Sequence, residues 1–404
     1  MSRIRSKAGG RIELPAYETV ALLLQGGGAL GAYQAGVFEG LHEAGIQPNW
    51  FAGISIGALN TAIIAGNAPE DRVARLREFW ETICRPAFGM PIPPAVEDTL
   101  FSWSDDFRRH FTAFQAASAM LNGQKGFFQP RVPPSMPDIP GDPQTASYYD
   151  TRALKATLER LCDFERINAG QVRVSVGAVN ARTGNFAYFD NTRQILRPEH
   201  FMASGALPPG FAAVEIDGEY YWDGGLMSNT PLYEVVHNSE RRDTLAFQVD
   251  LWSAVGRVPH SINEVTGRVK DIQYSSRTRL VTDLLQHNQR FRNLVHQLLE
   301  AMPQDDPGKA HLYDLAKEIS CDRRYNIIHL IYRDKEYEGH YKDYQFGPST
   351  MREHWKAGLT DIRRTLANRD WLDMPASDPG FVTHDIHRDA RQPGNRESSR
   401  AGRT

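Results

Sequence analysis

The chain has 404 residues, a formal net charge of -3 at pH 7 and a charged fraction of 24%, all ordinary for a globular protein. Its basic residues form no strong cluster, so nucleic acid is not an expected partner. Three cysteines, Cys84, Cys162 and Cys321, lie far apart without metal-ligand spacing, which argues against a disulfide framework and fits a reducing compartment. No apolar run reaches the ~20 residues that span a bilayer, and no apolar segment follows the basic N-terminus as in a signal peptide. We therefore expect a cytoplasmic protein, with peripheral contact at the inner face of the membrane left open.

Residues 1–17 are polar and predict a flexible arm. The next stretch, residues 18–65, predicts two strand–turn–helix units. An apolar run at residues 20–24 leads into a glycine-rich turn at residues 25–31 and then a helical segment. A second apolar lead-in precedes Gly53-Ile54-Ser55-Ile56-Gly57, which fits the G-x-S-x-G turn that exposes a nucleophilic serine at the end of a strand. A glycine-rich turn at a helix N-terminus aims backbone N–H groups at negative charge. The two units together predict a nucleophile, Ser55, beside an oxyanion hole.

Prolines and aromatic residues distinguish residues 86–147 from their surroundings. Two proline-rich stretches bracket a segment in which Phe107, Phe111 and Phe114 recur at helical spacing. Such an insertion is expected either as a satellite helix packed on the core or as a lid over a binding site, and the sequence favours neither.

Asp223 is the residue best suited to act with Ser55. It follows an aromatic strand pattern and precedes Gly224 and Gly225, which predicts that its carboxylate lies on a sharp turn. An ordinary Asp-Gly-Gly hairpin turn is the simpler interpretation of these three residues alone. A Ser-Asp-His triad would need a downstream histidine, and neither His237 nor His260 lies in a stretch typical of a catalytic turn.

From about residue 255 the pattern changes to long amphipathic helices. Arginines at positions 277, 279, 290 and 292 flank an apolar helical stripe, which consists of Leu280, Leu284, Phe291, Leu294, Val295, Leu298 and Leu299. A helix packed on its own domain is the commoner explanation of such a stripe, and a membrane-surface or partner helix is the alternative. Residues 241–372 are expected to be mostly helical with one strand at 327–332, and the polar residues 373–404 are expected to be disordered.

Three motifs in one order closely resemble the patatin-like phospholipase family. Residues 26–31 match its G-x-G-x-x-G oxyanion loop, residues 53–57 its G-x-S-x-G elbow, and residues 223–225 its D-G-[AG] motif. The resemblance covers residues 18–240 and implies a catalytic domain built as a three-layer α/β/α sandwich with a mainly parallel central sheet, followed by a C-terminal helical extension. It also implies a Ser55–Asp223 dyad, an oxyanion hole at Gly26, Gly27, Gly28 and Ala29, and supporting glycines at Gly31, Gly53, Gly57, Gly224 and Gly225.

The resemblance further implies that the chain hydrolyses acyl lipids or other carboxylic esters through an acyl-serine intermediate, without a metal ion or cofactor. A carboxylate with a pKa of ~3.9 is a weak base toward a serine hydroxyl, so Asp223 is expected in a partly desolvated position. Phospholipids, lysophospholipids, neutral glycerides and hydroxyalkanoate esters all stay open as substrates. The aromatic segment at residues 101–128 is a candidate lining for an acyl channel. The sequence specifies no oligomeric state.

Two other functions compete with hydrolysis. A dinucleotide-binding oxidoreductase would use residues 26–31 to bind phosphate, but it needs an acidic residue after the second strand pattern, and residues 46–51 contain none. A non-catalytic lipid-binding or scaffolding protein would keep the same fold. The intact Ser55, Asp223 and glycine-rich turn argue against this second alternative.

Overall fold

The computed structural model describes residues 11–88, 92–135, 141–237, 240–302, 310–378 and 380–389, and it gives the backbone alone for residues 94, 276–279 and 389. At the centre lies a nine-stranded sheet with the order β11-β10-β9-β1-β2-β5-β8-β7, in which β6 also pairs with β5. The strands from β11 to β5 run parallel, and β6, β7 and β8 form antiparallel pairs. Their bounds are β1 Thr19–Leu24, β2 Trp50–Ile54, β5 Arg173–Asn180, β6 Phe186–Asp190, β7 Val214–Ile216, β8 Glu219–Asp223, β9 Thr244–Asp250, β10 Tyr325–Ile331 and β11 Phe381–Asp385.

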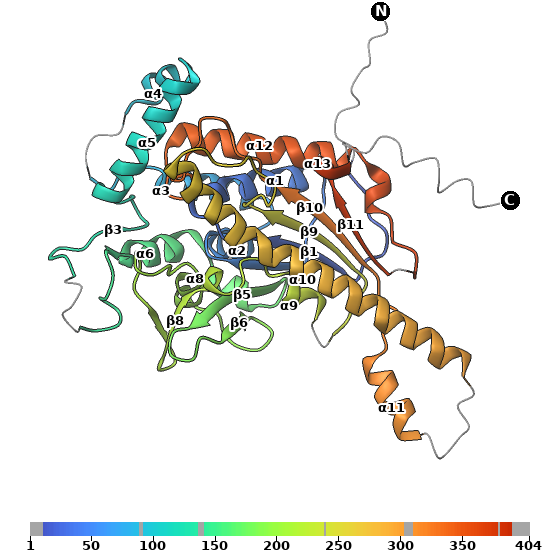
Figure 1. Cartoon of the computed structure of the whole chain (residues 1–404). Helices are drawn as coiled ribbons and strands as arrows, with labels where there is room; N and C mark the ends of the chain where they lie inside the picture. Colours follow the sequence, from blue (N-terminus) through green and yellow to red (C-terminus); the bar gives the residue numbers. More distant parts are fainter. Residues whose placement is uncertain are drawn as a thin grey trace, which may run out of the picture.

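Helices cover both faces of this sheet (Figure 1). They include α1 Ala32–Glu43, α2 Ile56–Ala65, α3 Arg72–Ile83, α6 Arg152–Leu161, α7 Phe164–Asn168, α8 Pro198–Ser204, α9 Leu232–Val236, α10 Ile262–Ala301 and α12 Pro348–Leu366, with 3-10 turns at Gly28–Gly31 (η1), Gly224–Leu226 (η2) and Arg369–Leu372 (η4).

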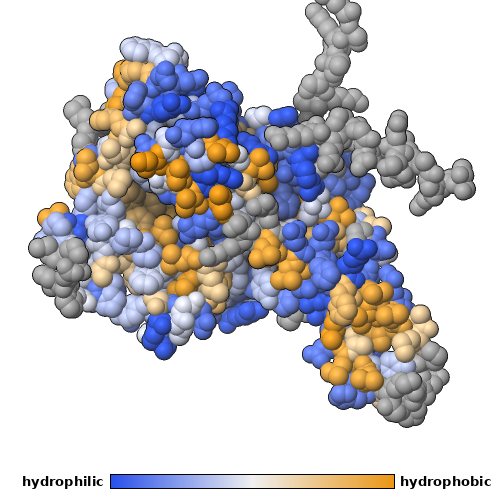
Figure 2. Space-filling model, viewed as in Figure 1, coloured by the Kyte–Doolittle hydropathy of each residue, from blue (hydrophilic) through white to orange (hydrophobic). Residues whose placement is uncertain are grey.

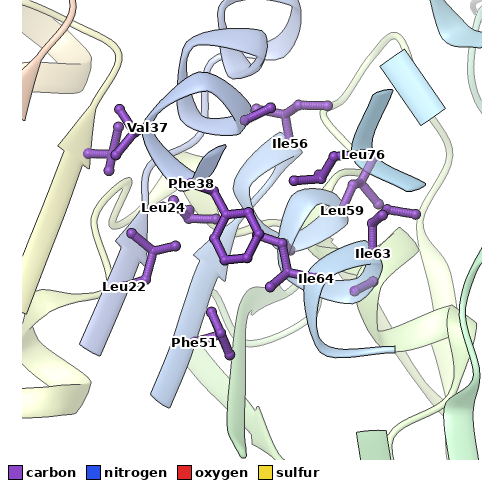
Figure 3. Close-up of a cluster of buried hydrophobic side chains, with 14 of the residues drawn as sticks. Leu22, Leu24, Val37, Phe38, Phe51, Ile56, Leu59, Ile63, Ile64 and Leu76 are labelled. Atoms are coloured by element: carbon purple, nitrogen blue, oxygen red, sulfur yellow. The ribbon is translucent and has the colours of Figure 1, made fainter. Parts of the chain in front are cut away.

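The alternation of side chains along β1 explains the two layers. Leu22 and Leu24 point into a core shared with α1, α2 and α12, while Ala21 and Leu23 point into a second core with α9 and α10. Figure 3 shows the first core, where Phe38 of α1 lies close to the side chains of α2. The expected three-layer α/β/α sandwich with a mainly parallel sheet is confirmed.

The C-terminal region builds part of this sheet. β9 lies between β1 and β10 and pairs in parallel with both, so residues 241–372 supply two strands where one was expected. The expectation of disorder from residue 373 is wrong for residues 381–389, which form β11 and α13 (Ile386–Asp389). The short polar strand β11 gains its stability from pairing with the buried β10, which its own composition does not reveal. Residues 390–404 lie outside the described part.

Helix α12 packs directly on α1 through glycines. A Cβ atom on Gly36 would lie 1.9 Å from the Trp355 carbonyl oxygen, and one on Gly358 would lie 2.0 Å from the Tyr33 carbonyl oxygen. Only glycine permits backbones to approach this closely. The C-terminal region is therefore fixed against the helix that follows the glycine-rich turn.

The described part of the expected N-terminal arm is held against the body of the protein. The Ile12 N–H donates to the Ala44 carbonyl at 2.8 Å, and the Tyr17 hydroxyl donates to the Asp373 carbonyl at 2.8 Å. Residues 11–17 are thus anchored, which differs from the flexible arm expected there, and residues 1–10 lie outside the described part.

The insertion at residues 86–147 packs on the body of the protein, as expected of a satellite helix. It contains α4 (Pro94–Phe101), α5 (Asp105–Asn122) and β3 (Gln129–Pro130), which pairs with β4 (Tyr149–Asp150). Phe101 and Phe111 form a small core with Tyr337 of the C-terminal region. The other end of the insertion, at Phe127 and Phe128, reaches the main core.

Most of the apolar stripe of α10 faces solvent, contrary to the expectation that it packs on its own domain, although Leu299 is buried. Leu280 is 71% exposed and Phe291 56%, whereas Leu285 and Gln289 on the opposite side are buried. The packed face is thus partly polar, and the sequence pattern pointed to the wrong side. Figure 2 shows hydrophobic residues gathered where α10 and α11 (Ala310–Ile319) project from the body. None of the described helices is long and apolar enough to cross a membrane.

Candidate active site

Ser55 lies on a strained turn between β2 and α2. Its φ of 55° is in the left-handed region, which few residues with a side chain adopt. A Cβ atom on Gly53 would meet the Gly57 carbonyl oxygen at 2.4 Å, and one on Gly57 would meet the Leu24 carbonyl oxygen at 2.2 Å. Both glycines are therefore required sterically. The turn has the geometry of a nucleophile elbow.

Ser204, at the end of α8, supports this turn. Its hydroxyl accepts a hydrogen bond from the Ser55 backbone N–H at 2.9 Å and donates to the Gly177 carbonyl at 2.6 Å. The side chain is fully buried, so both bonds are shielded from water. The sequence did not predict this contact, because it joins residues distant in the chain.

Asp223 ends β8 and lies directly beside Ser55. The Ser55 hydroxyl donates to Asp223 Oδ2 at 2.6 Å, and the Gly225 N–H donates to Asp223 Oδ1 at 2.7 Å. Strand β8 pairs with β5 and continues into η2, so this segment is not the hairpin turn considered as the simpler interpretation. The structure brings the two predicted residues into direct contact.

Burial changes the acidity of Asp223. The side chain is 2% exposed, and desolvation raises its pKa to about 7, although the hydrogen bonds from Ser55 and Gly225 act in the opposite direction. A carboxylate with this pKa is a stronger base than an exposed aspartate, and it is still ionised to a large extent at neutral pH.

The glycine-rich turn between β1 and α1 lies against Ser55. A Cβ atom on Gly26 would come within 2.9 Å of the Ser55 Cβ and 2.4 Å of Asn229 Oδ1. The Gly26 carbonyl accepts hydrogen bonds from Asn229 Nδ2 at 3.0 Å and from Trp252 Nε1 at 2.8 Å. Hydrogen bonds from the side chains of Asn229 and Trp252 thus hold Gly26 so close to Ser55 that no residue with a Cβ atom would fit there.

The backbone N–H groups of this turn are not equally available. The Gly26 N–H donates to the Asn229 carbonyl at 3.3 Å, and the Ala29 N–H donates to the Asp343 carbonyl at 2.8 Å. Within the part of the chain that the structure describes, the N–H groups of Gly27 and Gly28 donate to no protein acceptor. The expected set of oxyanion donors, Gly26 to Ala29, is therefore reduced to Gly27 and Gly28, since the other two N–H groups are engaged.

Asp343 lies in residues 334–346 of the C-terminal region, and this segment contacts the glycine-rich turn. A Cβ atom on Gly28, whose φ is +55°, would lie 2.0 Å from the Asp343 carbonyl oxygen. The Lys270 ammonium group of α10 donates to both carboxylate oxygens of Asp343, at 2.8 and 2.9 Å, and to the His340 carbonyl at 3.2 Å. All three N–H groups of Lys270 therefore donate to residues of this segment.

Three further ion pairs hold the 334–346 segment. The buried ammonium group of Lys342 lies 2.6 Å from Asp271 of α10 and 2.6 Å from Asp334 within the segment. On the other side, His354 of α12 lies 2.6 Å from Glu338, and the pKa of the Glu338 carboxyl is lowered, against its desolvation, by hydrogen bonding to and the charge of His354. The segment that contacts the glycine-rich turn is thus anchored to helices on both faces of the sheet.

Ser55 and Asp223 open into a cavity of about 430 Å³. One wall consists of aromatic side chains from four separate parts of the chain: Phe127 and Phe128 from the insertion, Tyr149 from β4, Phe211, and Phe346 from the C-terminal region. These rings contact one another, with centroids 5.0 Å apart for Phe128 and Tyr149 and 5.6 Å apart for Phe127 and Phe346. The cavity can therefore receive an apolar group next to a serine hydroxyl. Phe101 and Phe111, which were also candidates for its lining, pack elsewhere.

Histidines do not belong to this site. None is among the described residues that line the cavity, and His237 instead stacks on Tyr233 at the surface. A Ser-Asp-His triad would need an imidazole in contact with the Ser55–Asp223 pair. Among the described residues there is also no group of histidine, cysteine and acidic side chains that could hold a metal ion.

Comparisons with known proteins agree with this geometry. The family model described as patatin-like phospholipase matches residues 22–236, and a second, described as patatin phospholipase, matches residues 272–378. The crystal structure of VipD from Legionella pneumophila aligns over 91% of this chain and 72% of its own, with 15% sequence identity and a TM-score of 0.36. A comparison with curated proteins found no match. Since the first model covers more than half of the sequence, together with the serine elbow, Asp223 and the glycine-rich turn, the chain belongs to the patatin-like phospholipase family of lipid hydrolases.

Proposed function

We propose that the protein is a carboxylic ester hydrolase that cleaves acyl lipids with a Ser55–Asp223 dyad. The observation that carries this proposal is the 2.6 Å hydrogen bond from the serine hydroxyl to a buried carboxylate, at the end of a cavity with an aromatic wall. No imidazole is needed, because the desolvated Asp223 is basic enough to accept the proton itself.

In the first half of the reaction Ser55 Oγ attacks the carbonyl carbon of the ester, and its proton moves to Asp223 Oδ2. The tetrahedral oxyanion collapses and breaks the bond to the alcohol, which leaves with the proton from Asp223. In the second half Asp223 takes a proton from water as the water oxygen attacks the acyl-serine. Collapse of the second tetrahedral intermediate releases the carboxylic acid and returns the proton to Ser55.

Stabilisation of the oxyanion falls to the N–H groups of Gly27 and Gly28. They are the donors of the turn without a protein acceptor among the described residues, and they precede the N-terminus of α1, where the helix dipole adds positive potential. One such donor is typically worth ~3 kcal/mol in the transition state. Because the Gly28 backbone touches Asp343, the position of the second donor depends on the 334–346 segment.

The aromatic wall of the cavity supports an acyl chain as the group bound beside Ser55. Charged side chains near the reacting atoms are few in the described lining, where Lys270 and Asp343 neutralise each other. An uncharged ester with an apolar acyl group is therefore the best match to the site. A hydroxyalkanoate ester is the alternative within the same chemistry.

The test is the release of p-nitrophenol from a series of esters that runs from acetate to palmitate and includes 3-hydroxybutyrate. We expect turnover by the wild type, with the best chain length set by the aromatic cavity, and none by Ser55→Ala. Ser102→Ala, which changes an exposed serine that is not part of the cavity lining, is the matched control and keeps full activity. Equal turnover by Ser55→Ala and the wild type would overturn the proposal.

A further inference from the structure

The projecting ends of α10 and α11 carry a continuous apolar surface. Along α10 the exposed apolar side chains lie three or four residues apart, except that the polar His287 occupies the position between Leu284 and Phe291. Helix α11 has the same spacing. We call this set the α10–α11 surface; it consists of Leu280, Leu284, Phe291, Leu294, Leu298 and Met302 with Leu312, Leu315 and Ile319. Each of these side chains is more than two-fifths exposed, so no described part of the chain covers the surface.

Buried amide groups fix the orientation of α10. On the opposite side of the helix, Gln289 Nε2 donates to the carbonyls of Cys321 and Arg323, at 3.2 and 2.7 Å, and Asn293 Nδ2 donates to the Ser377 carbonyl. Rolling the helix to bury its apolar stripe would break these bonds and leave buried polar groups unpaired. The stripe is therefore held outward by the fold.

Helix α11 is held in place as well. The Arg241 guanidinium donates to the carbonyls of Glu318, Ile319 and Ser320, at 3.2, 3.3 and 3.0 Å, which caps the C-terminal end of the helix. Immediately after it, the Cys321 N–H donates to the Arg292 carbonyl of α10 at 3.3 Å. The two helices thus present their apolar side chains as one pre-formed surface (Figure 2).

The spacing and the charges identify the kind of partner. A narrow stripe with alternating intervals of three and four is typical of a seam between packed helices. The described residues of the region, 280–302 and 310–319, contain four acidic and three basic side chains and no tryptophan. Helices that lie on membranes are instead rich in Lys and Arg on their polar face. A protein surface of helices fits these observations better than a lipid surface.

We propose that the α10–α11 surface is the site at which two copies of this chain associate. At about half exposure, its nine side chains offer on the order of 700 Å² of apolar area per copy, close to what a stable interface buries on each partner. Two such surfaces related by a two-fold axis would pack four helices against one another, and this is the commonest symmetry of soluble oligomers.

The experiment compares the mass of the full chain by sedimentation or light scattering across the micromolar range. We expect the wild type to reach twice the single-chain mass of 45.5 kDa as concentration rises, and Leu294→Glu/Leu298→Glu to stay at the single-chain mass. Both positions are about half exposed, so the charges cost the isolated chain little stability, which circular dichroism and thermal unfolding check. Ile195→Glu places the same charge on a 74% exposed apolar residue elsewhere and is expected to associate like the wild type.

Two results would overturn the proposal. One is a wild type that keeps the single-chain mass at the highest concentration, and the other is a glutamate variant that still doubles its mass. Flotation with phosphatidylcholine vesicles, with and without phosphatidylglycerol, separates the alternatives: a single-chain wild type that floats with vesicles, while the glutamate variant does not, assigns the surface to lipid instead.

Discussion

The backbone carbonyl of Asp343 accepts the N–H of Ala29 at 2.8 Å, although the two residues lie near opposite ends of the chain. This bond joins the C-terminal region to the glycine-rich turn that lies against Ser55. Because the Ala29 N–H is engaged in it, Asp343 also determines which N–H groups of the turn are left for an oxyanion. The two segments matched by separate family models thus meet at the glycine-rich turn.

The pH dependence of hydrolysis should follow the ionisation of Asp223. Burial raises its pKa to about 7, and only the deprotonated carboxylate can accept the serine proton. We therefore expect kcat/KM to rise as pH increases through about 7 and to level off above it, which a pH profile with a p-nitrophenyl ester measures. A profile that is already level at pH ~5 would show that Asp223 titrates in its ordinary range or does not act as the base.

Asp223→Asn should remove activity and also change how stability depends on pH. In the wild type the folded state holds this proton up to about pH 7, while the unfolded chain loses it near its ordinary pKa of 3.8, so stability falls as pH rises between these values. The amide carries no buried charge, so the variant should unfold at a higher temperature than the wild type above pH ~7, and this gain should shrink toward pH ~4. Thermal unfolding of both proteins at the two ends of this range tests the prediction, and a variant destabilised equally at both would contradict it.

Gly28→Ala should damage the site more than its backbone strain alone explains. The new Cβ atom would lie 2.0 Å from the Asp343 carbonyl oxygen, at a residue whose φ is already +55°. Gly218→Ala is the matched control, because Gly218 has a φ of +84° and a Cβ atom there would meet nothing within 4 Å. Both variants bear a strain of ~1–2 kcal/mol, but only Gly28→Ala must displace Asp343.

We expect a large loss of kcat for Gly28→Ala and near-normal kcat for Gly218→Ala, measured in parallel with the free energy of unfolding. Similar kinetics for the two variants would mean that the contact with Asp343 has no part in positioning the turn.

Lys270→Met should lower kcat, on the order of tenfold, with a smaller change in KM. The ammonium group donates all three of its hydrogens to the 334–346 segment, so its loss frees Asp343 and loosens the turn that this segment supports. Lys270→Arg keeps the charge and should retain most of the activity. As a control, Lys155→Met removes another lysine–carboxylate pair, 2.7 Å from Glu199 and remote from the cavity, and should leave kcat unchanged. Full kcat in Lys270→Met would refute the positioning role.

The sequence predicted the parts of the site that depend on local patterns. Ser55 follows from a strand, a glycine-flanked turn and a helix, which are neighbours in the chain, and Asp223 followed once the family resemblance supplied its pairing. The supporting contacts of Ser204, Asn229 and Asp343 were not predicted, because each forms only when segments distant in the sequence are packed together. Asp343 in particular lies in a polar stretch without periodicity and acts through its backbone carbonyl, which no residue type reveals.

Prediction of the fold likewise succeeded where a local pattern decides the structure and failed where contacts between distant segments decide it. The apolar run of β1 predicted a strand correctly, since a strand that is buried on both faces is apolar along its whole length. For α10 the pattern predicted a packed stripe, yet the packed face holds Gln289 and Asn293 and the stripe lies outside. Periodicity identifies a face that needs a partner, but it does not say whether that partner belongs to the same chain.

The place of β9 at the middle of the sheet, next to β1, bears on the synthesis of the protein. A chain that emerges from the ribosome presents Ser55 long before β9 can pair with β1, and Asp343 follows β9 about a hundred residues later. The glycine-rich turn can reach its final form only after that point. A chain terminated before Asp343 would therefore carry Ser55 and the glycine-rich turn without the contact that holds this turn.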